Sequence, residues 1–248
     1  MRGGKVLNSR KALVTGASRG IGAATALKLA QRGYDVALNF RNKAPRAEQV
    51  AAQMAALGQT ALLAQADITN ENEVLAMIGL VAREFRHLDA LILNASGGLE
   101  TGKADDYAMT LNLTAQMNVA RGAAELLRPG GRIVFVTSHW AHFYGMKPVL
   151  PVYEPVAKSK RAGEDALRDY SVGLAQKGIS LIVVSGDAIE GTITPKLLER
   201  KSRGQFEPVS AKARVLPTVD EFAEAIAAAS VDADLANGQT IFVGSTDW

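Results

Sequence analysis

Residues 11–22 of this chain read KALVTGASRGIG. The first five, Lys11–Thr15, form an apolar run typical of a buried strand, and a helix is expected to begin at Gly20. The glycines have different uses: Gly16 permits a tight turn, Gly20 lets the backbone approach an anion, and Gly22 lets the helix pack closely on the strand. The N–H groups and positive dipole at the start of such a helix attract phosphate. This stretch therefore predicts a strand–loop–helix unit that binds a dinucleotide.

Beyond this unit, short β-branched runs alternate with long Ala- and Leu-rich stretches. The apolar runs lack a clean alternation of polar and apolar residues, which indicates strands buried on both faces of a parallel sheet. The pattern predicts an α/β fold, a single-domain, Rossmann-like, doubly wound parallel sheet. Further strands are expected at Asp35–Phe40, Thr60–Ala66, Asp89–Leu93, Arg132–Thr137, Ile179–Val184 and Thr240–Val243. Helices are expected at Gly20–Arg32, Pro45–Leu57, Glu71–Arg86, Asp105–Leu127, Pro155–Lys177 and Val219–Ser230.

The composition excludes several classes of protein. Of the 248 residues, 48% are hydrophobic and 21% are charged, which is incompatible with a disordered chain. The net charge is only +3 and no block of like charges occurs, so neither nucleic acid nor a membrane is an expected partner. Cys is absent and no apolar leader or membrane-length apolar run occurs, so a cytoplasmic protein is expected. One domain is expected over residues 1–248, with an irregular lid at about 192–217.

The loop TGASRGIG resembles the cofactor loop of the short-chain dehydrogenase/reductases, and the resemblance covers nearly the whole chain. Residues 67–68 (DI) resemble the adenine contact of that family, and residues 93–96 (LNAS) resemble its N-N-A-G segment. Asn112 matches the structural and catalytic Asn, and Ser138 matches the serine that touches the substrate carbonyl. The resemblance implies strand order 3-2-1-4-5-6-7, a small-molecule carbonyl or alcohol substrate, and a homodimer or homotetramer. It also implies cofactor contacts at Gly16, Ser18, Arg19, Gly20, Ile21, Gly22, Asp67, Ile68, Asn94, Ala95, Lys160 and Thr192.

The end of the second predicted strand bears on the choice of cofactor. An NAD enzyme would place Asp or Glu there to bind the ribose hydroxyls. This chain instead reads LNFRN over residues 38–42, with no acid, and Arg19 lies in the glycine loop. Two guanidinium groups, those of Arg19 and Arg41, would suit a 2′-phosphate. The sequence therefore favours NADP(H) over NAD(H), with Arg41 and Asn42 as further predicted contacts.

The expected active-site motif departs from the family pattern. Short-chain reductases carry Tyr-x-x-x-Lys, in which the ammonium lowers the pKa of the tyrosine and also holds the nicotinamide ribose. Here Lys158 lies five residues after Tyr153, and Lys160 lies seven residues after it. Residues 174–179 (LAQKGI) match the L-A-x-x-G-I of the family. Counting back from them aligns Lys160 with the family lysine and places Val156 at the tyrosine position.

Three interpretations of the proton donor stay open at this point. Tyr153 could act from a displaced backbone position, Tyr144 could act instead, or the chain could bind the dinucleotide without reductase chemistry. Pro155 is typical of a first helical position, so Tyr153 could belong to the loop that precedes the helix.

The leading hypothesis is an NADP(H)-dependent oxidoreductase that interconverts a carbonyl and a secondary alcohol. Ser138 would orient the carbonyl, Tyr153 would be the acid/base, Lys160 would hold the ribose and tune the tyrosine, and Asn112 would anchor a water. The alternative is a non-catalytic dinucleotide-binding or sensor protein on the same fold.

Two other segments complete the predicted site. Residues 185–192 (SGDAIEGT) depart from the Pro-Gly of the family, but Thr192 matches the threonine that binds near the nicotinamide amide. Asp187 adds a negative charge in this segment. His139 and His142 have no acidic cluster beside them in the sequence, so no metal site is expected.

Overall fold

A parallel seven-stranded sheet forms the centre of the computed structural model, which describes residues 9–100, 102–192 and 216–247. The strand order is β3-β2-β1-β4-β5-β6-β7, which confirms the predicted order and fold class. The order reverses between β1 and β4, and ligands of such sheets bind at the carboxyl ends of the strands near this point. The strands are β1 (Arg10–Val14), β2 (Tyr34–Phe40), β3 (Ala61–Gln65), β4 (Leu88–Leu93), β5 (Leu127–Ser138), β6 (Ser180–Gly186) and β7 (Thr240–Val243).

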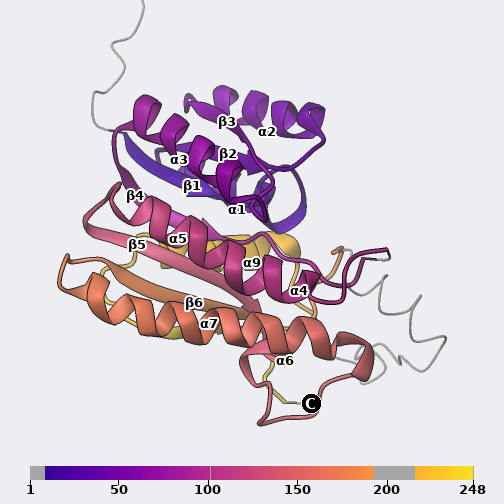
Figure 1. Cartoon of the computed structure of the whole chain (residues 1–248). Helices are drawn as coiled ribbons and strands as arrows, with labels where there is room; N and C mark the ends of the chain where they lie inside the picture. The colour runs from indigo at the N-terminus through magenta and orange to yellow at the C-terminus, as the bar shows by residue number, and fades with distance from the viewer. Residues whose placement is uncertain (1–8, 101, 193–215, 248) are drawn as a thin grey trace, which may run out of the picture.

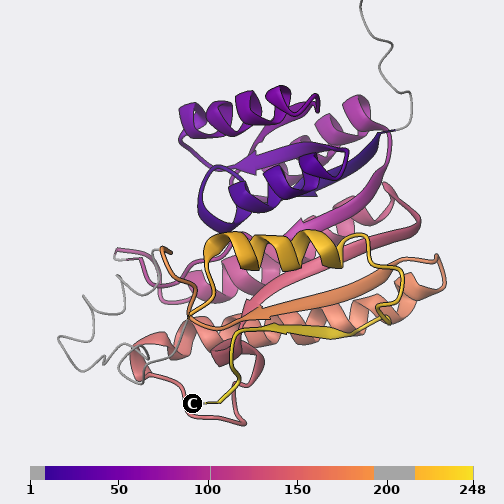
Figure 2. The same cartoon turned by 180° about the vertical axis from the view of Figure 1, so that it is seen from behind.

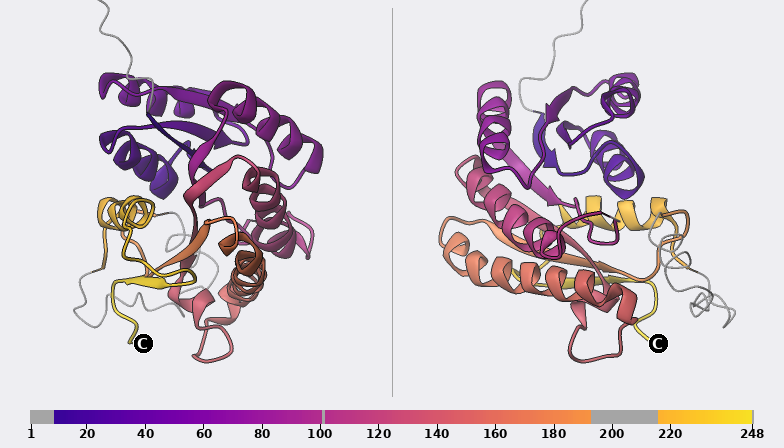
Figure 3. Two further views of the ribbon diagram at one scale, coloured as in Figure 1. Left: turned by 90° about the vertical axis from the view of Figure 1, so that its left-hand side faces the viewer. Right: turned by 45° about the vertical axis from the view of Figure 1, so that its right-hand side comes forward.

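Helices cover both faces of the sheet, as the front and rear views show (Figures 1 and 2). One layer contains α3, α5 and α7, the other contains α1, α2 and α9, and Figure 3 shows both layers from the side. The long helices are α1 (Gly20–Gln31), α2 (Ala44–Ala56), α3 (Glu71–Phe85), α5 (Gln116–Ala124), α7 (Glu154–Ala175) and α9 (Val219–Ala229). Two short helices, α4 (Tyr107–Met109) and α6 (His139–His142), follow β4 and β5.

Each face of the sheet has its own apolar core. Leu13 of β1 belongs to the core beneath α3, α5 and α7, whereas its neighbours Ala12 and Val14 belong to the core beneath α1, α2 and α9. All three side chains are fully buried. Because both faces are covered, the strand has no polar side, which explains the absence of polar–apolar alternation in the sequence.

The predicted helix over Asp105–Leu127 forms as one uninterrupted helical run, but it begins two residues later, at Tyr107, and ends three residues earlier, at Ala124. The segment contains α4, then a π-helical turn over Thr110–Ala115, and then α5. β5 already begins at Leu127, five residues before the predicted start at Arg132, because Leu127 pairs with Leu88 of β4. An apolar leucine continues a helical pattern equally well, so only strand pairing distinguishes the two states. The other predicted boundaries differ from the structure by one or two residues at most.

Most of the predicted lid at about 192–217 lies outside the described residues. Of that segment the structure describes Thr192 and residues 216–217, where the carbonyl of Pro217 accepts a hydrogen bond from the N–H of Glu190 at 2.9 Å. In the described parts of the chain, no helix has both the length and the apolar character needed to cross a membrane.

A glycine brings α7 against the π-helical turn that follows α4. A Cβ at Gly163 would lie 2.1 Å from the carbonyl oxygen of Asn112, so only glycine permits this approach. The contact matters for the site because α7 and the π-helical turn carry Lys160 and Asn112, two of the predicted functional residues.

We expect Gly163→Ala and Gly173→Ala to have opposite effects, although both lie in α7. Gly163→Ala should lower the free energy of unfolding by about 1–3 kcal/mol, because its Cβ collides with backbone. Gly173 is exposed and has nothing within 4 Å of an added Cβ, so Gly173→Ala should raise stability by up to about 1 kcal/mol through helix propensity. Urea denaturation of both variants measures the difference, and a Gly163→Ala protein as stable as the wild type would contradict the packing described.

Candidate active site

A pocket opens at the carboxyl ends of the central strands. The space inside it, counted together with its open mouth, is about 850 Å³. Ser138, Tyr153 and Lys160 all line it, so the structure brings three of the four predicted catalytic residues together. Four predicted cofactor contacts, Ile21, Asn94, Lys160 and Thr192, line the same pocket.

Ser138 and Tyr153 form a hydroxyl pair in this pocket. Their Oγ and Oη atoms lie 3.1 Å apart, within hydrogen-bond distance. Ser138 is the last residue of β5 and also the N-cap of α6, where its Oγ accepts a hydrogen bond from the N–H of Ala141 at 3.4 Å. The ring of Trp140 packs edge-on against the Tyr153 ring, with centroids 5.2 Å apart. The strand end therefore fixes one hydroxyl and an aromatic contact restrains the other.

Tyr153 reaches Ser138 from a short 3₁₀ turn, Pro151–Tyr153, that leads directly into α7. Val156, at the family position of the tyrosine, is buried in one apolar cluster with Tyr153, so no hydroxyl occupies that position. Tyr144 lies elsewhere: its hydroxyl donates to the carboxylate of Glu154 at 3.0 Å on the exposed surface, and it does not line the pocket. Of the two candidate tyrosines, the geometry therefore places only Tyr153 beside the serine.

Burial shifts the pKa values of Tyr153 and Lys160 in opposite directions. Burial raises the pKa of the Tyr153 phenol, and the hydrogen bond from Ser138 only partly opposes this. Burial lowers the pKa of the Lys160 ammonium to about 8, against the attraction of the carboxylate of Glu164. The family pattern implies a tyrosine pKa lowered by the lysine, whereas here the Tyr153 pKa is raised. At neutral pH the tyrosine is therefore protonated and the lysine is charged.

Asn112 lies behind the pocket wall rather than in it. Its amide nitrogen donates to the carbonyl of Gly97 at 2.9 Å and to the hydroxyl of Ser159 at 3.0 Å, while its amide oxygen accepts from the N–H of Gly97 at 3.3 Å. The side chain thus ties the loop after β4 to α7, next to Lys160 in sequence. The predicted role for Asn112, anchoring a water, stays a prediction.

The glycine loop forms a cradle that side chains would fill. Gly16 and Gly20 have positive φ angles of 67° and 54°, and a Cβ at Gly22 would lie 2.3 Å from the carbonyl oxygen of Gly16. No side chain caps the first turn of α1, whose N-cap residue is the exposed Arg19. Ser18 precedes it in the same loop, half-buried. The residues present therefore fit the phosphates of a dinucleotide, because backbone N–H groups are open to an anion.

Thr15 holds this loop against the end of β4, a role that the sequence reasoning missed. Its hydroxyl accepts hydrogen bonds from the backbone N–H groups of Asn94 and Ala95, at 2.9 and 3.0 Å. The amide of Asn94 donates in return to the carbonyl of Thr15 at 3.0 Å. Two predicted contacts, Asn94 and Ala95, thus position the loop, and Asn94 also lines the pocket.

At the far end of the predicted cofactor site, Arg41 is held by two neighbours. It donates to the hydroxyl of Tyr107 at 3.1 Å and lies 3.7 Å from the carboxylate of Asp67. Asp67 also accepts two hydrogen bonds from Thr69, which shape the turn after β3. Asn42 is exposed beside Arg41, and Ile68 is buried. Tyr107 was not predicted, because nothing in the sequence links α4 to the end of β2.

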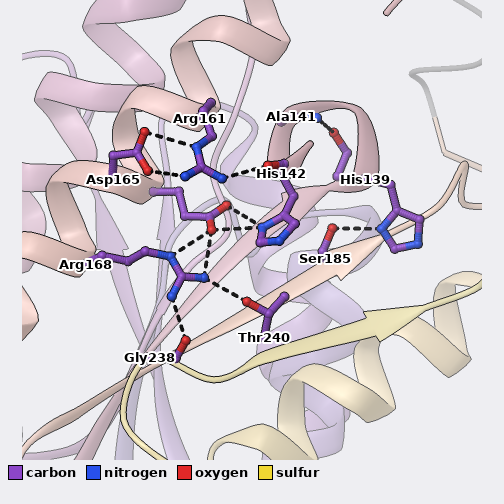
Figure 4. Close-up of polar contacts among 11 residues, drawn as sticks. His139, Ala141, His142, Arg161, Asp165, Arg168, Ser185, Gly238 and Thr240 are labelled. Atoms are coloured by element: carbon purple, nitrogen blue, oxygen red, sulfur yellow. Dashed lines mark hydrogen bonds and ion pairs between the residues drawn. The ribbon is translucent and has the colours of Figure 1, made fainter. Parts of the chain in front are cut away.

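Asp187 and Thr192 line the pocket on the side of β6, as predicted for Thr192. The hydroxyl of Thr192 donates to the carbonyl of Ile189 at 2.9 Å. The two histidines of α6 contact separate partners, since His139 Nδ1 lies 2.8 Å from the hydroxyl of Ser185 and His142 contacts the buried carboxylate of Glu164 (Figure 4). Within the described ranges, no group of three His, Cys, Asp or Glu side chains could hold a metal ion.

Comparison with known proteins places this geometry in context. A family model described as short chain dehydrogenase matches residues 10–202. Hydroxynaphthalene reductase arp2 of Aspergillus fumigatus is 35% identical over 185 residues, which cover 72% of this chain and 66% of that protein.

Two solved structures share the fold over nearly the whole chain. A short chain dehydrogenase from Burkholderia cenocepacia in complex with NADP has a TM-score of 0.77 and 29% identity, covering 97% of this chain and 98% of that one. A 7α-hydroxysteroid dehydrogenase complexed with NADH and 7-oxo glycochenodeoxycholic acid has a TM-score of 0.78 and 27% identity, covering 97% and 96%. Similar structures therefore hold either dinucleotide.

The lowered pKa of Lys160 predicts a pH-dependent stability. The folded-state pKa of about 8 lies below the ordinary 10.5, so below pH 8 the folded state bears the cost of a buried charge. Between pH 8 and about 10.5 the unfolded state binds more protons, so stability rises with pH by about 2 kcal/mol from pH 7 to pH 10. Lys160→Met should remove this rise and be more stable than the wild type at pH 7.

Urea denaturation at pH 7 and pH 10 checks this expectation. Lys158→Met is the matched control, because Lys158 lies in the same helix but is exposed. An identical pH dependence for Lys160→Met and the wild type would show that Lys160 is not a buried cation.

Proposed function

This chain belongs to the short-chain dehydrogenase/reductase family, and on that premise we propose that it is an NADP(H)-dependent reductase that interconverts a carbonyl and a secondary alcohol. The hydroxyl pair of Ser138 and Tyr153 carries the proposal, because two donors 3.1 Å apart can bind one carbonyl oxygen. Lys160 lines the same pocket and supplies the cation that the family motif requires.

In the proposed reaction the substrate oxygen lies between Ser138 Oγ and Tyr153 Oη. Ser138 donates a hydrogen bond that orients and polarises the carbonyl. A bound nicotinamide would supply the hydride for the carbonyl carbon. Tyr153 gives its proton to the oxygen, and its raised pKa keeps that proton available at neutral pH. The charged Lys160 holds the nicotinamide ribose, as the family resemblance implies.

The choice of NADP(H) rests on the end of β2. Asn39 there turns its amide inward, donating to the carbonyls of Ala64 and Ala66 at 3.1 Å, so this strand end carries an amide where an NAD enzyme would carry a carboxylate. Arg41 follows, exposed and beside Tyr107. A guanidinium in this position would pair with a 2′-phosphate. Arg19 would add a second positive charge from the glycine loop.

The pocket wall supports an apolar carbonyl compound as the substrate. Trp140, Ile189 and Phe222 line it together with the polar groups named above. The name of the Aspergillus relative, a hydroxynaphthalene reductase, is consistent with a ring compound of this kind. We further propose a homodimer or homotetramer, which the family resemblance implies, and a cytoplasmic location, to which the absence of cysteine is suited.

A non-catalytic dinucleotide-binding protein is the second candidate. Val156 favours it, because the family tyrosine is missing at that position. The two candidates differ in one measurable property: the reductase turns over a ketone, whereas the binding protein takes up NADPH without turnover on any carbonyl of a ketone panel.

Tyr153→Phe tests the acid assignment. The variant should keep NADPH affinity, measured by nicotinamide fluorescence, while the rate of ketone reduction falls about 10²–10⁴-fold because the proton donor is gone. Tyr144→Phe is the matched control and should retain the rate, since the Tyr144 hydroxyl bonds to Glu154 and Tyr144 does not line the pocket. A Tyr153→Phe protein with the full rate would remove Tyr153 from the mechanism.

Arg41→Ala tests the choice of cofactor. The loss of a charge-assisted bond to a 2′-phosphate should weaken NADPH binding about 10- to 100-fold and leave NADH binding unchanged. Fluorescence titration with both cofactors gives the two affinities. Equal weakening for NADPH and NADH would contradict a 2′-phosphate site at Arg41.

A further inference from the structure

An ion cluster joins α6, α7 and the segment that leads into β7 (Figure 4). At its centre the carboxylate of Glu164 is fully buried. His142 Nδ1 lies 2.9 Å from one of its oxygens and 3.0 Å from the other, and Arg168 donates to it from Nε at 2.9 Å. Arg168 is itself fixed by the carbonyl of Gly238 at 2.6 Å and the hydroxyl of Thr240 at 2.8 Å. The anion is therefore held by side chains from α6 and α7, and Arg168 is held in turn by Gly238 and by Thr240 of β7.

Lys160 precedes Glu164 by four residues in α7, so the two side chains lie on the same face of the helix. Lys160 is also buried, and no described residue accepts a hydrogen bond from its ammonium. Burial lowers the pKa of Lys160 to about 8, and Glu164 is the charge that opposes this. Burial alone would raise the pKa of Glu164, but His142 and Arg168 hold it below its usual value. The carboxylate thus stays ionised one helical turn from Lys160, whose buried ammonium is stabilised by a negative charge.

The same cluster joins the two segments that carry the hydroxyl pair. His142 ends α6, which begins directly after Ser138, and Glu164 lies in α7, which begins directly after Tyr153. Arg161 adds a second link, since it donates from α7 to the carbonyl of His142 at 2.7 Å. A change at the cluster can therefore alter both the charge and the position of groups in the pocket.

We propose that Glu164 is a positioning residue for the reductase: held by Arg168 and His142, it keeps Lys160 charged and fixes α6 against α7. The proposal rests on the proposed function for its role in the reaction, whereas the coupling between Glu164 and Lys160 is a property of the folded chain alone. Glu164 does not line the pocket and acts only through other residues.

Other titratable groups also face Lys160 and Glu164. Tyr153, His139 and Asp187 line the same pocket as Lys160, from the 3₁₀ turn, from α6 and from the loop after β6. His142 and Arg168 face Glu164. The variants Glu164→Gln and Lys160→Met keep all of these side chains, so the non-additive part of their combined effect reports on the pair itself.

The first measurement needs no cofactor. Urea denaturation at pH 7 compares Lys160→Met with its parent in the wild-type background and in the Glu164→Gln background. Without the carboxylate the buried ammonium is less favourable, so Lys160→Met should raise the folding equilibrium constant about tenfold more in the Glu164→Gln background, equivalent to one pKa unit. Asp165→Asn is the control background, because it removes the neighbouring exposed carboxylate, and it should reproduce the wild-type value.

The second measurement follows function against pH. In the wild type the rate of ketone reduction should fall as Lys160 loses its proton near pH 8, and in Glu164→Gln the midpoint should lie about one pH unit lower. A purely structural role for Glu164 would lower the melting temperature without moving this midpoint.

Equal effects of Lys160→Met in the two backgrounds would overturn the proposal. Coupling without turnover on any ketone would instead overturn the proposed function, so the two failures are distinguishable.

If Glu164→Gln does not fold, Arg168→Gln gives the converse test. Arg168→Gln removes a positive charge from Glu164, so the carboxylate attracts the Lys160 ammonium more strongly. In this background the gain in the folding equilibrium constant on Lys160→Met should be at least about threefold smaller than in the wild type. An unchanged gain would overturn the proposal.

Discussion

The site depends on the hydrogen bond between Ser138 and Tyr153, whose oxygens lie 3.1 Å apart. One partner is fixed by the sheet, because Ser138 ends β5 and caps α6, while the other belongs to a 3₁₀ turn that leads into α7. Val156 occupies the family position of the tyrosine, and the Tyr153 hydroxyl reaches the serine from three residues earlier in the chain. The proposed chemistry therefore depends on where the oxygen lies and not on the residue number that bears it.

Burial determines the charges around this pair. It raises the pKa of Tyr153 and lowers that of Lys160, so the tyrosine holds a proton to donate while the lysine is close to losing its own. The buried carboxylate of Glu164 acts against the second effect. In a medium of low dielectric constant such a charge acts over a full helical turn with little screening. The ion cluster of Glu164, His142 and Arg168 therefore contributes to the electrostatics of the site, although none of these three residues lines the pocket.

Local sequence patterns were sufficient to locate the strands and the glycine loop, because both follow from short-range rules, whereas the strand order was implied by the family resemblance. Apolar runs gave the strands, and glycines at 16 and 20 adopt the positive φ angles that the loop requires. Contacts between distant segments were not predictable. The helix was predicted too far, to Leu127, because pairing with β4 is not visible in a helical pattern. The place of the Tyr153 hydroxyl depends on the 3₁₀ turn and on Trp140. The spacing of Lys160 and Glu164 was readable, but the burial that gives it meaning was not.

The central claim is that Tyr153, from its displaced position, gives the proton to the substrate oxygen. A crystal structure of the protein with NADP⁺ and a ketone substrate tests it most directly. The account predicts that Tyr153 Oη and Ser138 Oγ each lie about 3 Å from the same substrate oxygen. A structure in which the substrate oxygen binds Ser138 while Tyr153 Oη lies more than about 4 Å away, with a water or another side chain in its place, would contradict the account.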